Sequence, residues 1–265
     1  MATGTALDVN AGPVGPSGPN SMRIALPDGV TPSVSVNGGA YAALGSSFGG
    51  GSDLAALVAR SASIMGSSSW LWQMDDLLKS SLTSDWAVSG TWANNSAKGP
   101  GVWSATSASP AVISRTGGTP ILVANPSVTP WHIAGRMQHV VALQANDQKG
   151  ICNGTIVPNT NGCGAGIRQG VSATKFVFWT EKAGVLTSAL STVSIDTTNW
   201  HKIELWFDGT TLFGSVDNET PVTVTTAANI PSTVMGERHG VEVGTGTGVD
   251  QFFDYFYAAA ARTAT

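Results

Sequence analysis

The chain has 265 residues, and its 13 Lys and Arg against 17 Asp and Glu give a formal net charge of −4 at pH 7. This balance provides no electrostatic attraction for nucleic acid or an anionic membrane surface, so we expect neither as a partner. No apolar run approaches the ~20 residues of a membrane span, and no signal peptide is visible, so we expect no membrane insertion.

Charged residues make up only 11% of the chain, against roughly 25% in an average soluble domain. Nine Trp and eight Phe are enough for a sizeable core, which excludes disorder throughout. The surface must therefore consist largely of uncharged polar and small residues. Such a surface suits a protein covered by other subunits or one whose solubility rests on uncharged groups, and both cases are typical of virion and extracellular proteins.

Residues 1–52 contain few aromatic residues and no Trp, so they can hardly form a core of their own. Three G-P-x triplets between residues 12 and 20 predict an extended, polyproline-type segment, and residues 21–26 and 31–36 alternate like short strands. We expect an extended N-terminal anchoring arm. The residues assigned to it are Pro13, Pro16, Pro19, Arg23, Ile24 and Leu26.

Residues 53–74 are predicted to form a short helix and a linker. Ser52 can cap the helix, Leu54, Leu57 and Val58 follow at helical spacing with Ser61 and Met65, and Gly66 can end it.

All nine Trp lie from residue 69 onward, and residues 75–265 read as one all-β domain of many short strands. We predict strands at residues 131–143, 175–180, 200–207, 212–216, 222–224 and 251–257. Turns are expected at 208–211 and 217–218, and Ile203, Leu205 and Phe207 are expected on the inner face. The pattern predicts a β-sandwich.

The stretch NWHKIELWFDG at 199–209, followed by FGSVDNE at 213–219, resembles the laminin-G/concanavalin A-like jelly rolls. Their recurring phrase is a W-H-x-I-x-L strand, a turn, and a strand that ends in V-D-x. Trp86–Trp92 resembles their opening strand and Asp250–Tyr257 their last strand. The resemblance covers roughly residues 75 to 258 and implies an all-β jelly-roll β-sandwich, whereas the fold alone does not assign a function.

The segment GPNSMRIALPDG, residues 18–29, resembles the G-P-x-x-Q-R-V-x-L-x-x-D segments near the front of tailed-bacteriophage virion proteins. This second resemblance implies a protein of a phage particle, assembled in the host cytoplasm. Its partners would be major capsid, portal or tail proteins.

Enzymatic chemistry finds little support in the sequence. The E-x-D-x-x-E string of jelly-roll glucanases is missing, and Glu204 with Asp208 does not replace it. Jelly-roll lyases use Arg, a Gln-x-His pair and Tyr. Arg136, Gln138 and His139 with Tyr255 or Tyr257 are similar, but adjacent Gln138 and His139 must point to opposite faces.

No cofactor and no metal is expected. The four His residues are scattered without metal-ligand spacing, and a calcium site near Asn146, Asp147 or Asp217 has no dense acidic loop behind it. Cys152 and Cys163 enclose a loop that a disulfide could close, whereas cytoplasmic assembly argues against early oxidation, so both states stay open.

Loop tryptophans can stack on sugar rings. Trp92 and Trp103 flank a polar loop that includes Asn94, and these three residues are the candidate glycan contacts, with core packing as the alternative role.

Our leading expectation is a non-enzymatic virion protein, either a capsid decoration or cement protein or a head fibre, anchored by its N-terminal arm. A homotrimer is expected, since the G-P-x run suits a threefold axis. The alternatives are a receptor-binding or carbohydrate-adhesion module of a tail fibre, which binds a host surface glycan, and a polysaccharide lyase.

Overall fold

The computed structural model describes the chain in segments. These are residues 7–10, 21–25, 33–36, 42–43, 51–66, 70–75, 86–89, 92–94, 102–105, 111–115, 125–139, 148–154, 161–232, 237–242 and 251–261. The chain divides into two compact units, Met1–Arg60 and Ser61–Thr265. No helix within these segments is long and apolar enough to cross a membrane.

The first unit contains a four-stranded antiparallel sheet. Its strands, in spatial order, are β1 (Leu7–Asn10), β2 (Ser21–Ala25), β3 (Ser33–Val36) and β4 (Ala42–Ala43). The strands predicted at 21–26 and 31–36 are therefore present, and β1 and β4 were not predicted. The anchoring role of the arm stays a prediction.

The helix α1 (Gly51–Met65) matches the predicted one, although it starts just before Ser52. Leu57, Ser61 and Met65 are buried at the expected helical spacing. Gly66 ends the helix in a left-handed conformation, with φ +59°, and its N–H donates to the carbonyl of Ala62 at 3.1 Å.

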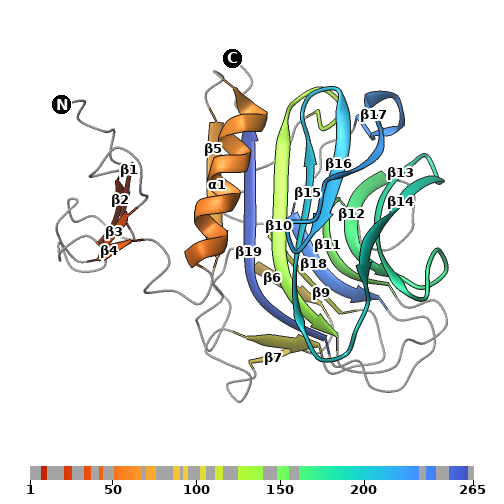
Figure 1. The fold of residues 1–265 in the computed structure, drawn as a ribbon, viewed down its shortest axis with the longest axis horizontal. Coiled ribbons are helices and arrows are strands. Elements are labelled where there is room, and N and C mark those ends of the chain that lie inside the picture. Colours follow the sequence, from red (N-terminus) through yellow and green to blue (C-terminus); the bar gives the residue numbers. More distant parts are fainter. Residues whose placement is uncertain are drawn as a thin grey trace. The chain divides into compact units, whose positions relative to one another are not determined.

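The second unit is a β-sandwich of two antiparallel sheets (Figure 1). The eight-stranded sheet has the order β17 (Val222–Thr226), β16 (Thr211–Val216), β15 (Trp200–Phe207), β10 (Trp131–His139), β19 (Gln251–Ala261), β8 (Trp103–Ala105) and β7 (Trp92–Asn94), with β5 (Trp70–Asp75) also paired to β19. A 3₁₀ turn, η1 (Ala227–Asn229), follows β17.

The seven-stranded sheet forms the other layer. Its order is β14 (Val185–Ser194), β13 (Lys175–Lys182), β12 (Asn161–Arg168), β11 (Gln148–Gly154), β18 (Glu237–Glu242), β9 (Ala111–Arg115) and β6 (Trp86–Ser89). The all-β jelly-roll sandwich with a short helix is thus the observed fold class.

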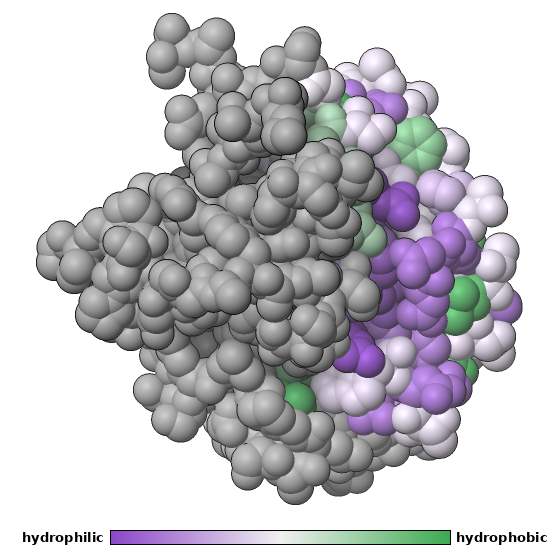
Figure 2. All heavy atoms as spheres, turned by 60° about the vertical axis from the view of Figure 1, so that its left-hand side comes forward, coloured by the Kyte–Doolittle hydropathy of each residue, from purple (hydrophilic) through white to green (hydrophobic). Residues whose placement is uncertain are grey.

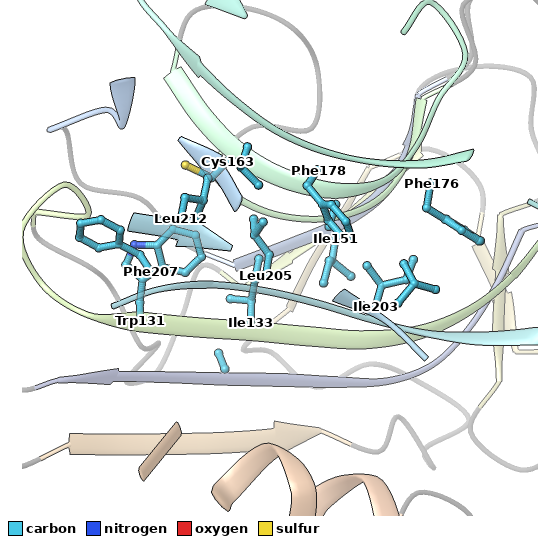
Figure 3. Close-up of a cluster of buried hydrophobic side chains, with 14 of the residues drawn as sticks. Trp131, Ile133, Ile151, Cys163, Phe176, Phe178, Ile203, Leu205, Phe207 and Leu212 are labelled. Carbon is cyan, nitrogen blue, oxygen red and sulfur yellow. The ribbon is translucent and has the colours of Figure 1, made fainter. Parts of the chain in front are cut away.

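The core lies between the two sheets. Figure 3 shows side chains of β10 and β15 from one sheet facing those of β11, β12 and β13 from the other. Ile203, Leu205 and Phe207 belong to this cluster, so the predicted inner face of β15 is confirmed. Phe178 packs onto Gly214 so closely that a Cβ there would lie 2.1 Å from its ring.

The predicted turns are also present. Asp217 and Asn218 both adopt positive φ, 50° and 63°, and join β16 to the next strand. Asp208 accepts hydrogen bonds from the backbone N–H groups of Thr210 and Thr211, both at 2.8 Å, which fixes the preceding turn.

One local prediction needs correction. Trp86–Trp92 was expected to be a single opening strand, but the chain changes layers inside it. Trp86 lies in β6 of the seven-stranded sheet and Trp92 in β7 of the eight-stranded sheet. Val141 and Leu143 of the predicted strand 131–143 lie outside the described residues.

Candidate functional site

The outer face of the seven-stranded sheet has a floor of glycines. Cys163, Ala165 and Ile167 of β12 point into the core, so the alternating Gly162, Gly164 and Gly166 face outward. In the register, Gly166 pairs with Gly150 of β11, and Gly150 pairs with Gly240 of β18. Three neighbouring strands therefore carry glycine at the same level.

Two of these glycines are required by geometry. Gly150 has φ +155° and Gly166 has φ +149°, and a Cβ on either would lie 2.1 Å from a backbone oxygen of the neighbouring strand. No side chain fits at these positions without displacing the backbone. The sequence thus places residues without side chains at the centre of this face, and we call them the glycine strip.

Trp179 of β13 lies on this strip. A Cβ on Gly164 would come within 2.3 Å of its indole ring, and Trp179 itself is only 1% exposed. The Arg168 guanidinium lies over the ring, 5.6 Å from its centroid, which is the range of a cation–π contact.

Arg168 also forms an ion pair across the glycine strip. Its Nη2 lies 3.3 Å from Oε2 of Glu181, and the two side chains are 9% and 13% exposed. Glu181 pairs with Gly162 at one end of β12, whereas Arg168 lies at the other end. The outward positions of β12 between them are glycines, so no side chain of β12 stands between Arg168 and Glu181.

Two buried polar atoms on this face have no hydrogen-bond partner in the described part of the chain. They are Nη1 of Arg168 and Oε1 of Gln148. Gln148 pairs directly with Arg168 across β11 and β12, and both face outward. An unsatisfied buried polar atom costs on the order of 1–3 kcal/mol, so a donor and an acceptor left side by side indicate a place for a ligand. We call this set the Trp179 patch: Gln148, Gly150, Gly164, Gly166, Arg168, Trp179 and Glu181.

A second polar cluster lies on the opposite side of the sandwich, on the outer face of the eight-stranded sheet. The Ser61 hydroxyl lies 2.8 Å from Nδ1 of His132 and 2.8 Å from the Tyr257 hydroxyl. Nε2 of His132 is 3.2 Å from Glu204, whose other oxygen is 2.7 Å from the Lys202 ammonium.

This cluster has the residue types of a nucleophile, a base and an acid, but Ser61 and His132 are fully buried and Glu204 is 1% exposed. Burial raises the pKa of Tyr257 well above its usual range, the hydrogen bond from Ser61 opposes this, and the Glu204 charge adds to it. No substrate can reach these groups in this structure. The cluster therefore anchors the end of α1 to the sheet.

His201 forms a third cluster at the edge of the sandwich. Its Nδ1 lies 2.7 Å from Asp217 and its Nε2 3.1 Å from Asp196. Burial alone would lower the pKa of His201, but its hydrogen bonds and charge interactions with the two carboxylates raise it above the usual value.

The sequence-predicted glycan contacts lie together in the β7–β8 pair, where Asn94 pairs with Trp103. Trp92 is half-buried and packs against the core, with its ring centroid 5.8 Å from that of Phe253. This favours core packing for Trp92. The side chains of Asn94 and Trp103 lie outside what the structure describes, so their contact with glycans stays a prediction.

Among the predicted arm residues, Arg23 and Ile24 lie in β2, where Arg23 pairs with Asp8 and Ile24 with Leu7. Pro13, Pro16, Pro19 and Leu26 lie outside the described residues.

Cys152 and Cys163 do not form a disulfide. Both thiols are reduced and buried. Cys152 pairs with Gly164 and Cys163 with Asn153 in the β11–β12 ladder, so the two side chains point to opposite faces. The spacing in the sequence suggested a loop closure, but the loop is a hairpin whose register separates the two sulfurs.

The lyase candidates do not converge. Gln138 donates to the carbonyl of Thr198, His139 lies 3.4 Å from the Lys149 ammonium, and Arg136 lies over Trp200. Tyr257 belongs to the Ser61 cluster. Of the candidate calcium ligands, Asp217 binds His201, and Asn146 and Asp147 lie outside the described residues. No group of His, Cys, Asp or Glu in the described segments suits a metal ion.

Sequence reasoning missed the Trp179 patch. The available signal was the alternation of glycine with small apolar residues at 161–166, which indicates one bare face of a strand. Trp179 and Arg168 come from different strands, and only the register of the sheet brings them together.

A scan against protein-family models found no match, and neither did a search of curated proteins. Among solved structures, the Crh5 transglycosylase in complex with NAG is similar, with a TM-score of 0.51 and 13% identity over 73% of this chain and 84% of that one. A protein of unknown function from Shewanella oneidensis MR-1 has a TM-score of 0.50 and 15% identity over 75% and 90%. A glycosyl hydrolase family protein from Mycobacterium fortuitum has a TM-score of 0.48 and 13% identity over 70% and 98%.

The expectation of a non-enzymatic protein is overturned by this comparison, since the fold is shared with a transglycosylase. The expectation rested on the missing E-x-D-x-x-E string. Polar groups on one sheet face can come from different strands, as Arg168 and Glu181 do, so a missing string on one strand does not exclude chemistry on the face.

Proposed function

We propose that this protein is a carbohydrate-recognition jelly roll and that the Trp179 patch binds the sugar. The observation that carries this proposal is the unpartnered Nη1 of Arg168 beside the unpartnered Oε1 of Gln148. Arg168 is only a donor, whereas the Gln148 oxygen is only an acceptor. A sugar hydroxyl accepts and donates at once, so neighbouring hydroxyls satisfy both atoms.

The surroundings of the two atoms support the same ligand class. Glu181 holds the guanidinium of Arg168 in place from the other side, at 3.3 Å. Trp179 supports Arg168 from below and is too buried to be a stacking surface itself. Hydrogen bonding by oriented polar groups therefore dominates recognition.

A glycan array with the purified chain, followed by calorimetry on the best ligand, tests this function. Gln148→Leu and Arg168→Lys are each expected to weaken binding about tenfold or more, because each leaves a sugar hydroxyl without its partner. Lys182→Met is the matched control, since it removes a positive charge from the end of β13 outside the patch. Product analysis on the same glycans reports whether they are also cleaved or transferred.

Binding to no glycan, or equal binding by both patch variants and the wild type, would contradict the proposal. Loss of binding in the Lys182→Met control as well would point to general charge attraction rather than to the patch.

We further propose that the sandwich is carried on a phage particle and recognises a host surface glycan there. Support comes from the low fraction of charged residues and from the resemblance of residues 18–29 to virion proteins. Deletion of residues 1–50 is expected to abolish incorporation into particles. Full occupancy by the truncated protein would contradict the anchoring role.

A further inference from the structure

The strand β14 is a free edge of the seven-stranded sheet, and in the described part of the chain it pairs only with β13 (Figure 1). Three of its side chains are apolar and accessible to solvent: Val185 is 68% exposed, Leu190 45% and Leu186 38%. Among the described residues, Val128 is the one other large apolar side chain that is exposed. On the face that Figure 2 shows, the apolar residues are scattered among hydrophilic ones.

Residues 185–190 of this edge lack the usual protection against pairing, and the register shift of the β13–β14 pair comes only after them, between Leu190 and Ser194. Soluble proteins blunt their edge strands with charged residues, Pro or bulges. The run VLTSALS at 185–191 contains no charged residue, no Pro and no Gly. An edge of this kind is a template for another strand.

The backbone groups available for pairing follow from the hairpin. Ala183 and Gly184, both with positive φ, join β13 to β14, so Lys182 and Val185 form the closing hydrogen-bonded pair. Since hydrogen-bonding direction alternates along a strand, Thr187 and Ala189 also bond to β13. The N–H and C=O groups of Leu186, Ser188 and Leu190 therefore point away from the sheet.

Beyond Leu190, the next outward-facing backbone groups of β14 belong to Thr192 and already have hydrogen-bond partners. The N–H of Thr192 donates to Glu219 at 2.7 Å, and the carbonyl of Thr192 accepts from the Lys175 ammonium. Glu219 also accepts from the Ser191 hydroxyl and from the N–H of Val216, which holds it in place. The free edge is therefore bounded by the turn at Gly184 and by this capped residue.

We propose that β14 pairs with β14 of a second copy of this chain about a twofold axis at Ser188. In this antiparallel register, Ser188 faces Ser188 of the partner subunit and Leu186 faces Leu190 of the partner subunit. Every outward-facing backbone group of the free edge then has a partner. The seven-stranded sheets of both copies become one continuous sheet.

The occupant is a second copy because the edge is complementary to itself. Leu186, Ser188 and Leu190 lie on one face, so the twofold brings two Leu–Leu cross-strand pairs around a central serine pair. The chain carries a net charge of −4, which disfavours contact between copies, but residues 185–191 carry none of it. Pairing stops at Thr192, where Glu219 and Lys175 already bind the backbone.

Disulfide trapping of the full chain tests the register. In a hydrogen-bonded antiparallel pair, opposite Cα atoms lie about 5.5 Å apart, within the reach of a disulfide. Ser188→Cys is therefore expected to cross-link under mild oxidation. Leu186→Cys is the matched control, because two copies of residue 186 lie about 13 Å apart along the strand. The native Cys152 and Cys163 are buried and do not interfere.

Sedimentation equilibrium gives the second readout. Ser188→Pro removes an N–H that points away from β13, so the hairpin stays intact while the central intermolecular pair is lost. We expect the dimer dissociation constant to rise about tenfold or more, and Ser188→Ala, which keeps the N–H, to dimerise like the wild type. Ser188→Lys places like charges opposite each other and is also expected to give monomers.

A monomeric or trimeric wild-type chain at micromolar concentrations would overturn the proposal. So would equal cross-linking of the Ser188→Cys and Leu186→Cys variants, or unchanged dimerisation of Ser188→Pro with native circular dichroism. A trimer would instead agree with the threefold arrangement expected from the G-P-x run.

Discussion

His201 illustrates how single residues set the response of this protein to pH. Both of its ring nitrogens face a carboxylate, so the protonated imidazolium is the favoured form. For Asp196, burial would raise the pKa, but hydrogen bonds from Asn199 and Thr198 together with the His201 charge lower it well below its usual range. Both shifts stabilise the folded state while His201 is charged and Asp196 ionised.

The contribution of this cluster to folding has a defined pH window. The pKa of His201 is raised in the folded state, so its contribution is complete below its unfolded value near pH 6.5 and is lost as the pH rises through the folded value. The lowered pKa of Asp196 makes its contribution complete above about pH 4 and lost as the pH falls through the folded value.

We therefore predict that His201→Gln destabilises the fold by about 1 kcal/mol near pH 5, because the charge contacts are lost, and by less near pH 9. The side chains of Asp196 and Asp217 are 36% and 40% exposed, so solvent screening keeps the effect small. Urea titrations of both proteins at the two pH values measure it. The His201 ring also packs on Phe176, with the ring centroids 4.9 Å apart. A loss of stability that is equal at both pH values would assign the role of His201 to this packing alone.

At the scale of single elements, the last turn of α1, from Ser61 onward, belongs to the second unit and contacts the eight-stranded sheet there. Ser61 is fully buried and contacts both His132 of β10 and Tyr257 of β19. Such a buried polar contact defines one position of the helix end, since any shift would leave the hydroxyl groups unpaired.

Ser61→Ala is predicted to lower the free energy of unfolding by about 1–3 kcal/mol, because His132 and Tyr257 each lose a buried hydrogen-bond partner. Ser63→Ala is the control, since Ser63 is exposed in the same helix and Ala is the better helix former. Chemical denaturation of the two variants gives the comparison. Equal stability of both would contradict the anchoring role of the Ser61 cluster.

Elements with a recognisable pattern in their own sequence could be predicted. Features that depend on pairing between strands far apart in the sequence could not. The hairpin of β15 and β16 followed from alternation and from the Asp208–Gly209 turn, and α1 followed from its spacing and from Gly66. The split of residues 86–92 between two sheets was hidden, since the alternation of a strand does not say which layer it joins.

The same reasoning explains why the sequence did not reveal the candidate site. The Trp179 patch depends on the register between β11, β12 and β13, which sets Arg168 beside Gln148 and Trp179 above Gly164. No local pattern encodes that register. Trp92 and Trp103 were visible as tryptophans near a polar loop, but residue type alone does not distinguish core packing from ligand contact.

At the scale of the whole molecule, the chain is divided into two units, and the sandwich holds its own core. Among the described residues, the buried cluster runs from Trp131 to Ala260, with the half-buried Trp92 packed against it. A domain with its own core can fold without its neighbour.

We predict that a chain lacking residues 1–50, which keeps α1 complete, folds and shows a melting temperature within a few degrees of the full-length protein. Differential scanning calorimetry and near-ultraviolet circular dichroism, which reports the packed Trp residues, measure this. An insoluble or molten truncated protein would show that the first unit is needed for folding. If the truncated protein folds, its failure to enter particles in the incorporation assay cannot be attributed to misfolding.

The two cysteines give the molecule a property that neither its fold class nor its surface reveals. Burial raises the pKa of the Cys163 thiol to about 12, and the hydrogen bond to Thr180 only partly opposes this. A protonated, enclosed thiol does not react with alkylating reagents at neutral pH. Alkylation of Cys163 therefore reports the rate at which the core opens.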